Sequence, residues 1–216
     1  IILDQQEIVY KIHYKRIKNC YLRVEKGEVV IRCSPLFPQS EIEKLIRNHQ
    51  EEILEQIKGY VPKYNYQEDG YVYLFNQKYQ IVLKDMNIKK CAIHDRQIYV
   101  YSKNIQATIE MFLKQELMNY LKERIDFYLS TSFHHVFPEI QIKKMKRRWG
   151  ACFYQKNRVC FNLVLAHIDY ALIDYVIVHE LCHFLEANHS KAFYHEIEKR
   201  MPDYKERERL LKDVGI

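Results

Sequence analysis

Residues 170–187 form the segment that most constrains the fold of this chain, because they read YALIDYVIVHELCHFLEA and are apolar on almost every side. A helix with apolar side chains all round is stable only when it is buried. Asp169 stands directly before the segment and can cap its first turn. We therefore predict a helix over residues 170–187 inside the core of an ordered protein, which excludes wholesale disorder.

His179, Glu180 and His183 lie close together in the middle of this apolar segment. Burying two imidazoles and a carboxylate costs several kcal/mol unless they are bonded or bind a metal. At about 100° per residue the two histidines lie about 40° apart and one turn along, so both rings can converge on one ion. Glu180 falls on the flank of that face, where it can reach a water bound to the metal. The H-E-x-x-H spacing therefore predicts a metal site with Glu180 as its acid–base residue.

A third histidine, His189, follows His183 by six residues and can join the site only if the helix ends in between. In a continuous helix it would lie about 240° round the axis and point away. We predict a break at Asn188, which tolerates the left-handed conformation at a helix C-terminus, and a new helix capped by Ser190. His189 then becomes the third ligand and leaves one position open for water, as a catalytic zinc site requires. The alternative is an acidic third ligand from the following helix, for which the candidates are Glu196, Glu198 and Asp203.

The first 104 residues are predicted to be β-rich with one helix. Runs of β-branched and aromatic residues with partial alternation predict strands within 9–16, 20–33, 71–84 and 91–101. Between them, residues 40–58 have the pattern of an amphipathic helix that ends at a glycine. Its proposed capping box is Ser40 with Glu43. Its apolar stripe consists of Ile42, Leu45, Ile46, Ile53, Leu54 and Ile57.

From about residue 105 the pattern becomes helical, starting with a long amphipathic run over 105–133 that contains no Gly or Pro. Two strands are predicted within 140–146 and 158–165, and a last short helix is expected after Asp203, which with Glu206 can cap it. We therefore expect an α+β fold. A β-rich N-terminal region, 1–104, is followed by a mainly helical catalytic region, 105–216, whose short β-sheet borders the cleft. Whether the two regions form a single compact unit stays open.

The net charge of +6, from 34 basic and 28 acidic residues, permits contact with a polyanion without requiring it. The densest basic run is Lys143–Arg148, for which we consider a solvated loop face and a weak nucleic-acid contact. The six cysteines form no C-x-x-C pair. The chain shows no secretory leader pattern and no apolar run near the ~18 residues that cross a bilayer. We therefore expect a cytoplasmic protein with reduced thiols and no membrane contact, of undetermined oligomeric state.

Residues 147–211 resemble the YgjP-like zinc metallopeptidases and, more distantly, the SprT-like metalloproteases. The family's motifs occur in order: RRWGAC, FNLVLAH, DYVIVHELCH and NHSKAFY, ending in PDY. The segment KRIKNCYLRVEKGEVVIRCSP is similar to the family's N-terminal part more loosely. Ala151, His167 and Tyr194 depart from the family's usual Ser, Pro and Trp. The resemblance implies a zincin-like catalytic part, with a zinc ion held by His179, His183 and His189 and with Glu180 as the acid–base residue.

These observations favour a zinc-dependent metallopeptidase that acts on peptides or proteins, with a metal-activated water and Glu180 as general base. Two alternatives stay open: a metal-dependent nucleotide or phosphoanhydride hydrolase, and a DNA-associated protease of the SprT-like type. Arg148 and Asn162 are candidate donors to the oxyanion. We expect Gly150 to serve a bend and Cys182 to pack in the helix, whereas the role of His167 is open. Imidazole ligands also accept divalent metals other than zinc.

Overall fold

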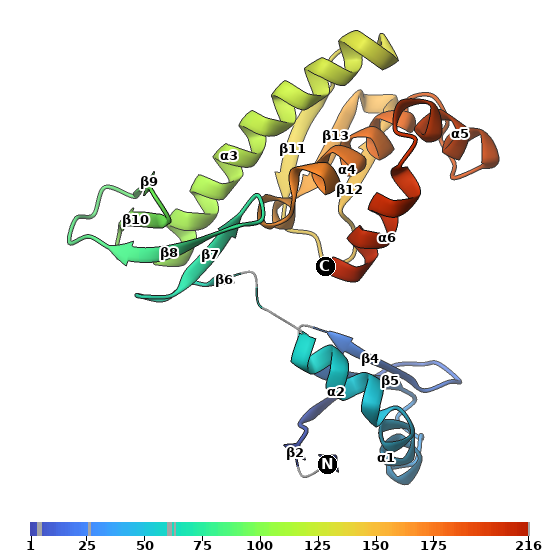
Figure 1. The fold of residues 1–216 in the computed structure, drawn as a ribbon. Coiled ribbons are helices and arrows are strands. Elements are labelled where there is room, and N and C mark those ends of the chain that lie inside the picture. Colours follow the sequence, from blue (N-terminus) through green and yellow to red (C-terminus); the bar gives the residue numbers. More distant parts are fainter. Residues whose placement is uncertain (4–5, 26, 60–61, 63, 216) are drawn as a thin grey trace. The chain divides into compact units, whose positions relative to one another are not determined.

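The computed structural model describes residues 1–3, 6–25, 27–59, 62 and 64–215 (Figure 1). The chain divides into two units, Ile1–Pro62 and Lys63–Ile216, each with a hydrophobic core of its own. The observed mixture of helices and small sheets confirms the α+β class. Within the described residues, no helix combines the length and the apolar character that crossing a membrane requires.

The first unit contains two small sheets. Strands β1 (Ile2–Leu3) and β2 (Gln6–Glu7) form an antiparallel pair. Strands β3 (Tyr10–Tyr14), β4 (Tyr21–Glu25) and β5 (Glu28–Cys33) form a sheet in the order β3-β5-β4, in which β5 is parallel to β3 and antiparallel to β4. The central strand β5 buries three consecutive β-branched side chains, Val29, Val30 and Ile31, as expected for a strand paired on both sides.

The helix predicted over 40–58 is in fact two helices, α1 (Gln39–Asn48) and α2 (Gln50–Gly59). The break lies at His49, whose ring Nδ1 hydrogen-bonds the Leu45 carbonyl oxygen at 3.0 Å. This carbonyl is the one that would accept the His49 backbone N–H in a continuous helix, and that N–H contacts the Ile46 carbonyl instead. The predicted capping box is also wrong. Residue Pro38 stands at the cap position, so Ser40 lies inside the first turn and caps nothing.

The second unit begins with a five-stranded sheet. Its strands are β6 (Tyr64–Asn65), β7 (Tyr71–Leu74), β8 (Gln77–Leu83), β9 (Lys90–His94) and β10 (Gln97–Tyr101), in the order β6-β7-β8-β10-β9. Strands β8 and β10 are parallel, and the other pairs are antiparallel. Alternate side chains of these strands enter the core, as the pleat of a half-buried sheet requires.

The long helix α3 (Ile105–Tyr128) follows this sheet and continues into a π-helical turn, Leu129–Phe133. Asn104 caps its first turn by accepting the Ala107 backbone N–H at 3.1 Å. The buried residues of α3 recur every four positions and share one hydrophobic cluster with the five-stranded sheet and with the later helices. The boundary predicted after residue 104 therefore falls inside the second unit. Helix α3 shares one core with the sheet that precedes it and with the helices that follow it.

A three-stranded sheet comes next, built from β11 (Glu139–Lys143), β12 (Gly150–Phe153) and β13 (Arg158–Asn162) in the order β11-β13-β12. Strand β13 is parallel to β11 and antiparallel to β12. The sequence prediction missed β12, which lies in the segment between the two predicted strands. The predicted strand 158–165 also ends earlier, at Asn162, where a 3-10 helix, Leu163–His167, begins.

Three helices complete the second unit: α4 (Tyr170–Cys182), α5 (Lys191–Arg200) and α6 (Tyr204–Val214). Helix α4 contacts α3, α5, α6 and β12, so it is covered on all sides, as its apolar sequence predicts (Figure 1). It ends at Cys182, five residues before the predicted end. The predicted cap of α4 is confirmed, because the Asp169 carboxylate accepts the Ala171 N–H at 2.8 Å. The side-chain cap predicted for Asp203 is absent, because Arg207 binds that carboxylate.

Candidate metal centre

Two of the predicted ligands, His179 and His183, stand at the C-terminal end of α4. His179 lies in its last turn, and His183 is the residue that follows the helix. Both side chains are half-buried, and the centroids of their rings are 5.3 Å apart. Because α4 is embedded in the core, neither ring can turn far from this end of the helix. The structure thus brings together the first two histidines, as their spacing predicts.

The chain reverses after α4 and returns His189 to the same place. The reversal starts at His183 itself, through backbone bonds from Phe184 to Leu181 (3.0 Å) and from Leu185 to Cys182 (2.9 Å). The left-handed conformation predicted at Asn188 is wrong, since Asn188 is not among the residues with positive φ. Helix α5 then begins with the predicted cap, in which Ser190 Oγ accepts the Phe193 N–H at 3.3 Å.

The three imidazoles each offer a nitrogen, and these nitrogens lie within 4.8 Å of one another. The Nε2 atoms of His179 and His189 are 3.0 Å apart. Zinc–nitrogen bonds of about 2.1 Å in a tetrahedral site place two ligand nitrogens about 3.4 Å apart, close to the observed spacing. The geometry therefore fits a single small ion.

The electrostatics of the two rings on the α4 side, His179 and His183, also suit a cation. Burial, together with the neighbouring His183 and His189, lowers the pKa of His179 to about 3, so its ring is neutral at pH 7. Burial likewise lowers the pKa of His183. The Nδ1 atom of His183 lies 3.2 Å from the Glu186 carbonyl oxygen, which fixes the tautomer that leaves Nε2 free to ligate. Neutral imidazoles with a lone pair toward a common point are the form in which histidine binds metal.

Phe193 forms an apolar floor beneath the three histidines. Its ring centroid lies 5.0 Å from that of His179, 4.6 Å from His183 and 4.8 Å from His189, and its side chain is fully buried. The Ser190 cap binds the backbone N–H of Phe193 and so fixes the first turn of α5. Sequence reasoning assigned no role to Phe193, although it belongs to the NHSKAFY element that carries the resemblance.

Glu180 is buried, with 5% of its surface exposed, and lies against strand β12. A Cβ atom added to Gly150 would stand 2.5 Å from Glu180 Oε1, so only glycine leaves room for this carboxylate. Burial raises the pKa of Glu180 to about 8, while the backbone N–H of Cys152 and the charge of Arg148 oppose that rise. The role predicted for Gly150, a bend, is replaced by a close approach to the side chain of Glu180.

The two candidate oxyanion donors differ in the structure. The Arg148 side chain is exposed, and its charge reaches Glu180. Asn162 is buried, and its amide nitrogen donates to the carbonyl oxygens of Met145 and Arg148, each at 2.8 Å. A donor already used twice inside the protein is not available to a substrate. The interpretation of Asn162 as an oxyanion donor is therefore wrong, whereas that of Arg148 stays a prediction.

Two residues whose roles were open have structural contacts. Nδ1 of the buried His167 lies 2.7 Å from the Tyr73 carbonyl oxygen. Cys182 is fully buried, and burial raises the pKa of its thiol to about 12. Cys182 is thus a neutral packing residue of α4.

Two of the three acidic alternatives for the third ligand, Glu196 and Asp203, bind basic side chains instead. Glu196 pairs with Lys199 (2.7 Å) and Arg200 (2.6 Å), and Asp203 pairs with Arg207 (2.8 Å). The cluster of potential ligands at this centre contains His189 and none of these carboxylates. The roles of the three histidines as ligands remain a prediction that the geometry favours.

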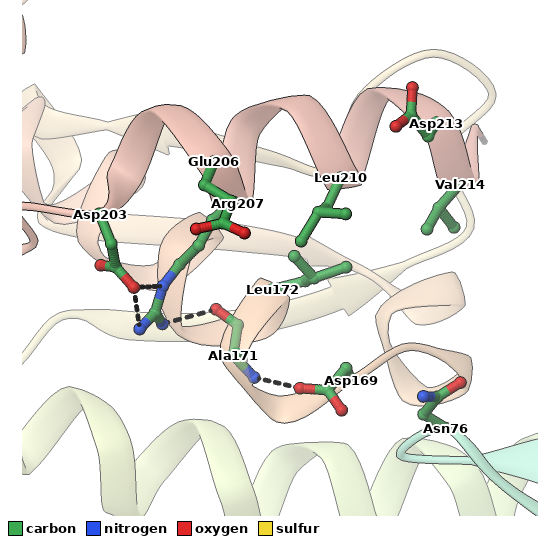
Figure 2. Close-up of a pocket in the computed structure, with 10 residues that line it drawn as sticks. All are labelled: Asn76, Asp169, Ala171, Leu172, Asp203, Glu206, Arg207, Leu210, Asp213 and Val214. Carbon is green, nitrogen blue, oxygen red and sulfur yellow. Dashed lines mark hydrogen bonds and ion pairs between the residues drawn. The ribbon is translucent and has the colours of Figure 1, made fainter.

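A separate groove of about 640 Å³ lies between the start of α4 and α6 (Figure 2). Leu172, Leu210 and Val214 give it an apolar side. Arg207 on α6 donates across it to the Ala171 carbonyl oxygen at 2.9 Å and also binds Asp203 at the start of α6. Neither Glu180 nor any of the three histidines lines this groove. It is therefore distinct from the candidate metal centre.

Comparisons with known proteins agree with the resemblance in the sequence. The model of the YgjP-like family, described as a metallopeptidase domain, matches residues 18–214. Among solved structures the chain is similar to two metallopeptidase zymogens, abylysin of Pyrococcus abyssi (17% identity, TM-score 0.40) and jannalysin of Methanocaldococcus jannaschii (24% identity, TM-score 0.39). Each match covers 44% of this chain and 94% or 96%, respectively, of the other. No curated protein matches. Because the family model spans most of the chain, this protein belongs to the YgjP-like family of metallopeptidase domains.

Proposed function

We propose that this protein is a zinc-dependent peptidase in which His179, His183 and His189 hold the ion and Glu180 is the general base. One observation supports this most strongly. Three imidazoles converge within 4.8 Å, and the buried carboxylate of Glu180 follows the first of them in the sequence. A bound zinc ion would supply Lewis-acid chemistry, lowering the pKa of water to about 7 and polarising a carbonyl group.

The protein's own residues would divide the remaining work. His179 and His183 are fixed by α4, and His189 is fixed by the capped start of α5, so the ligand set is preorganised. Phe193 closes one side of the rings with apolar surface and excludes water there. With three histidine ligands, a four-coordinate zinc ion would keep one position for water or substrate, as in catalytic zinc sites.

Glu180 would take a proton from the attacking water and return it to the leaving amine. A general base works best when its pKa is near the working pH, and burial raises the pKa of Glu180 to about 8. The Cys152 N–H holds the carboxylate from the side of β12, and the missing side chain of Gly150 leaves the space in which it lies. These two contacts restrict where the proton can be taken up and released.

The proposed substrate is a peptide or protein, in keeping with the family. Among the residues that the structure describes, no contact or cluster favours a nucleotide or nucleic acid over a peptide. Of the basic run Lys143–Arg148, Lys144 is paired with Glu110 at 2.6 Å, and Lys146, Arg147 and Arg148 are exposed. Nucleic-acid contact and a cytoplasmic location stay predictions.

The proposal is tested by measuring zinc content and peptide hydrolysis in two variants of the whole chain. We expect His189→Ala to bind less than about a tenth of the zinc of the parent protein and to lose casein hydrolysis, because two ligands remain. His195→Ala removes an exposed histidine from α5, the helix that follows His189, and should match the parent protein in both measurements. Full zinc binding by His189→Ala, or zinc binding without hydrolysis of any peptide by the parent protein, would contradict the proposal.

A further inference from the structure

One buried side chain makes several hydrogen bonds to residues 145–149, which form most of the chain between β11 and β12. Asn162, with 1% of its surface exposed, donates from Nδ2 to the Met145 and Arg148 carbonyl oxygens. Its Oδ1 accepts the Met145 N–H at 3.2 Å and the Val164 N–H at 3.3 Å. The amide is thus bonded at both ends to the backbone, and three of its four bonds go to the 145–149 loop.

The backbone of Asn162 continues this attachment. Its N–H donates to the Trp149 carbonyl oxygen at 2.8 Å, directly beside the pairing of Gly150 with Phe161 that opens the β12–β13 ladder. The position at which β12 begins is therefore set by contacts of Asn162. Such contacts fix a strand in place only while every one of the buried polar groups is satisfied.

The start of β12 is also the surface against which Glu180 lies. The Glu180 carboxylate lies so close to Gly150 that a Cβ atom at this position would clash with it. The Cys152 N–H hydrogen-bonds the same carboxylate. A shift of β12 would move both contacts at once. The same loop also carries Arg148, whose positive charge reaches Glu180.

We infer that Asn162 is a positioning residue for Glu180: it fixes the 145–149 loop and the start of β12 so that the carboxylate is held in the orientation that catalysis needs. This inference rests on the proposed role of Glu180 as general base. It assigns Asn162 no contact with substrate or metal, since its amide is used within the protein. A misplacement of about 1 Å at a reacting group can reduce a rate about 100-fold, so the effect is measurable.

The test uses Asn162→Asp, which keeps the Oδ1 acceptor and replaces the Nδ2 donor by an oxygen facing two carbonyl oxygens. We expect kcat for a peptide substrate to fall about 10- to 100-fold, while KM changes less than about threefold and zinc content is unchanged. The matched control is Asn157→Asp in the turn directly before β13, which loses one bond from Nδ2 to the Phe137 carbonyl oxygen (3.2 Å). This control should keep the parental kcat.

A double-mutant cycle separates positioning from a general structural role. If Asn162 acts through Glu180, Asn162→Asp should cause no further loss of the residual rate when Glu180 is already replaced by Gln. An equal loss in both backgrounds overturns the inference, as does a loss of zinc or a change confined to KM. If Asn162→Asp does not fold, Asn162→Ser, whose hydroxyl can still donate to one carbonyl, takes its place. Parental turnover in the Glu180→Gln variant alone would instead refute the proposed function.

Discussion

Helix α4 buries two carboxylates six residues apart, and their surroundings differ. Asp174 is saturated: Arg124 donates to it at 2.7 and 3.0 Å, and the hydroxyls of Tyr120 and Tyr128 donate at 2.8 and 3.2 Å. Glu180 instead accepts the Cys152 N–H and occupies the space that a side chain at position 150 would need. A buried charge costs free energy unless it is paired, so the first arrangement is suited to holding helices together.

The difference separates a structural carboxylate from the proposed general base within a single helix. The contacts of Asp174 join α4 to α3, and the pKa of Arg124 is raised chiefly by its hydrogen bonds to that carboxylate. The pKa of Glu180 is raised by burial that its few partners do not offset. Burial alone therefore does not mark a carboxylate as a candidate for catalysis, whereas incomplete pairing beside a cluster of candidate ligands favours that interpretation.

The largest effect is expected when Glu180 is changed. Glu180→Gln should reduce peptide hydrolysis about 10²- to 10⁴-fold, because an amide cannot accept the proton of the attacking water. Zinc content, measured by elemental analysis, should stay at the parental value, and the melting temperature should not fall, because no ion pair is lost. Parental activity in Glu180→Gln would show that Glu180, like Asp174, has no catalytic role.

The complementary change is Asp174→Asn, which should affect stability and spare catalysis. Leaving Arg124 without its partner should lower the free energy of unfolding by about 3 kcal/mol, measured by urea denaturation. The folded fraction should retain a kcat within about threefold of the parental value. Asp126→Asn, at an exposed position of α3, is the control and should change stability by less than about 0.5 kcal/mol. A catalytic defect in folded Asp174→Asn would mean that the two carboxylates act together.

The smallest effect is expected at a more exposed carboxylate, Glu196. Its hydrogen bonds to Lys199 and Arg200 lower its pKa to about 2. A lowered pKa stabilises the fold fully above the unfolded value of about 4.5, and this contribution disappears as the pH falls toward 2. Glu196→Gln should therefore cost about 0.5 kcal/mol at pH 7 and nothing near pH 2, as measured by denaturation at several pH values. A loss that does not vary with pH would show that the ion pairs contribute nothing.

The geometry of the metal centre could be predicted largely from local spacing. His179 and His183 are one turn apart, and the apolar composition of their helix predicts its burial. Ser190 was correctly predicted to cap the next helix. The position of the break was less predictable. The sequence suggested Asn188, whereas the helix ends at Cys182, because the chain needs the intervening residues to reverse.

Contacts between distant segments could not be predicted in this way. Gly150 and Glu180 are thirty residues apart, and β12 is too short to produce a clear alternating pattern. The partner of Asp174 is fifty residues away on α3, and no periodicity connects the two. Asn162 was recognised as notable, yet only the structure shows that its amide is spent on the backbone.

The three histidines are unequally shielded, since His189 is exposed whereas His179 and His183 are half-buried above the Phe193 ring. A bound ion would therefore be most accessible to solvent on the side of His189. When a chelator removes the ion, His189 would dissociate first. His179 and His183 would stay in position and could bind the next ion. Loss and reloading of the cation should accordingly involve local fraying at the start of α5 and leave the core helix intact.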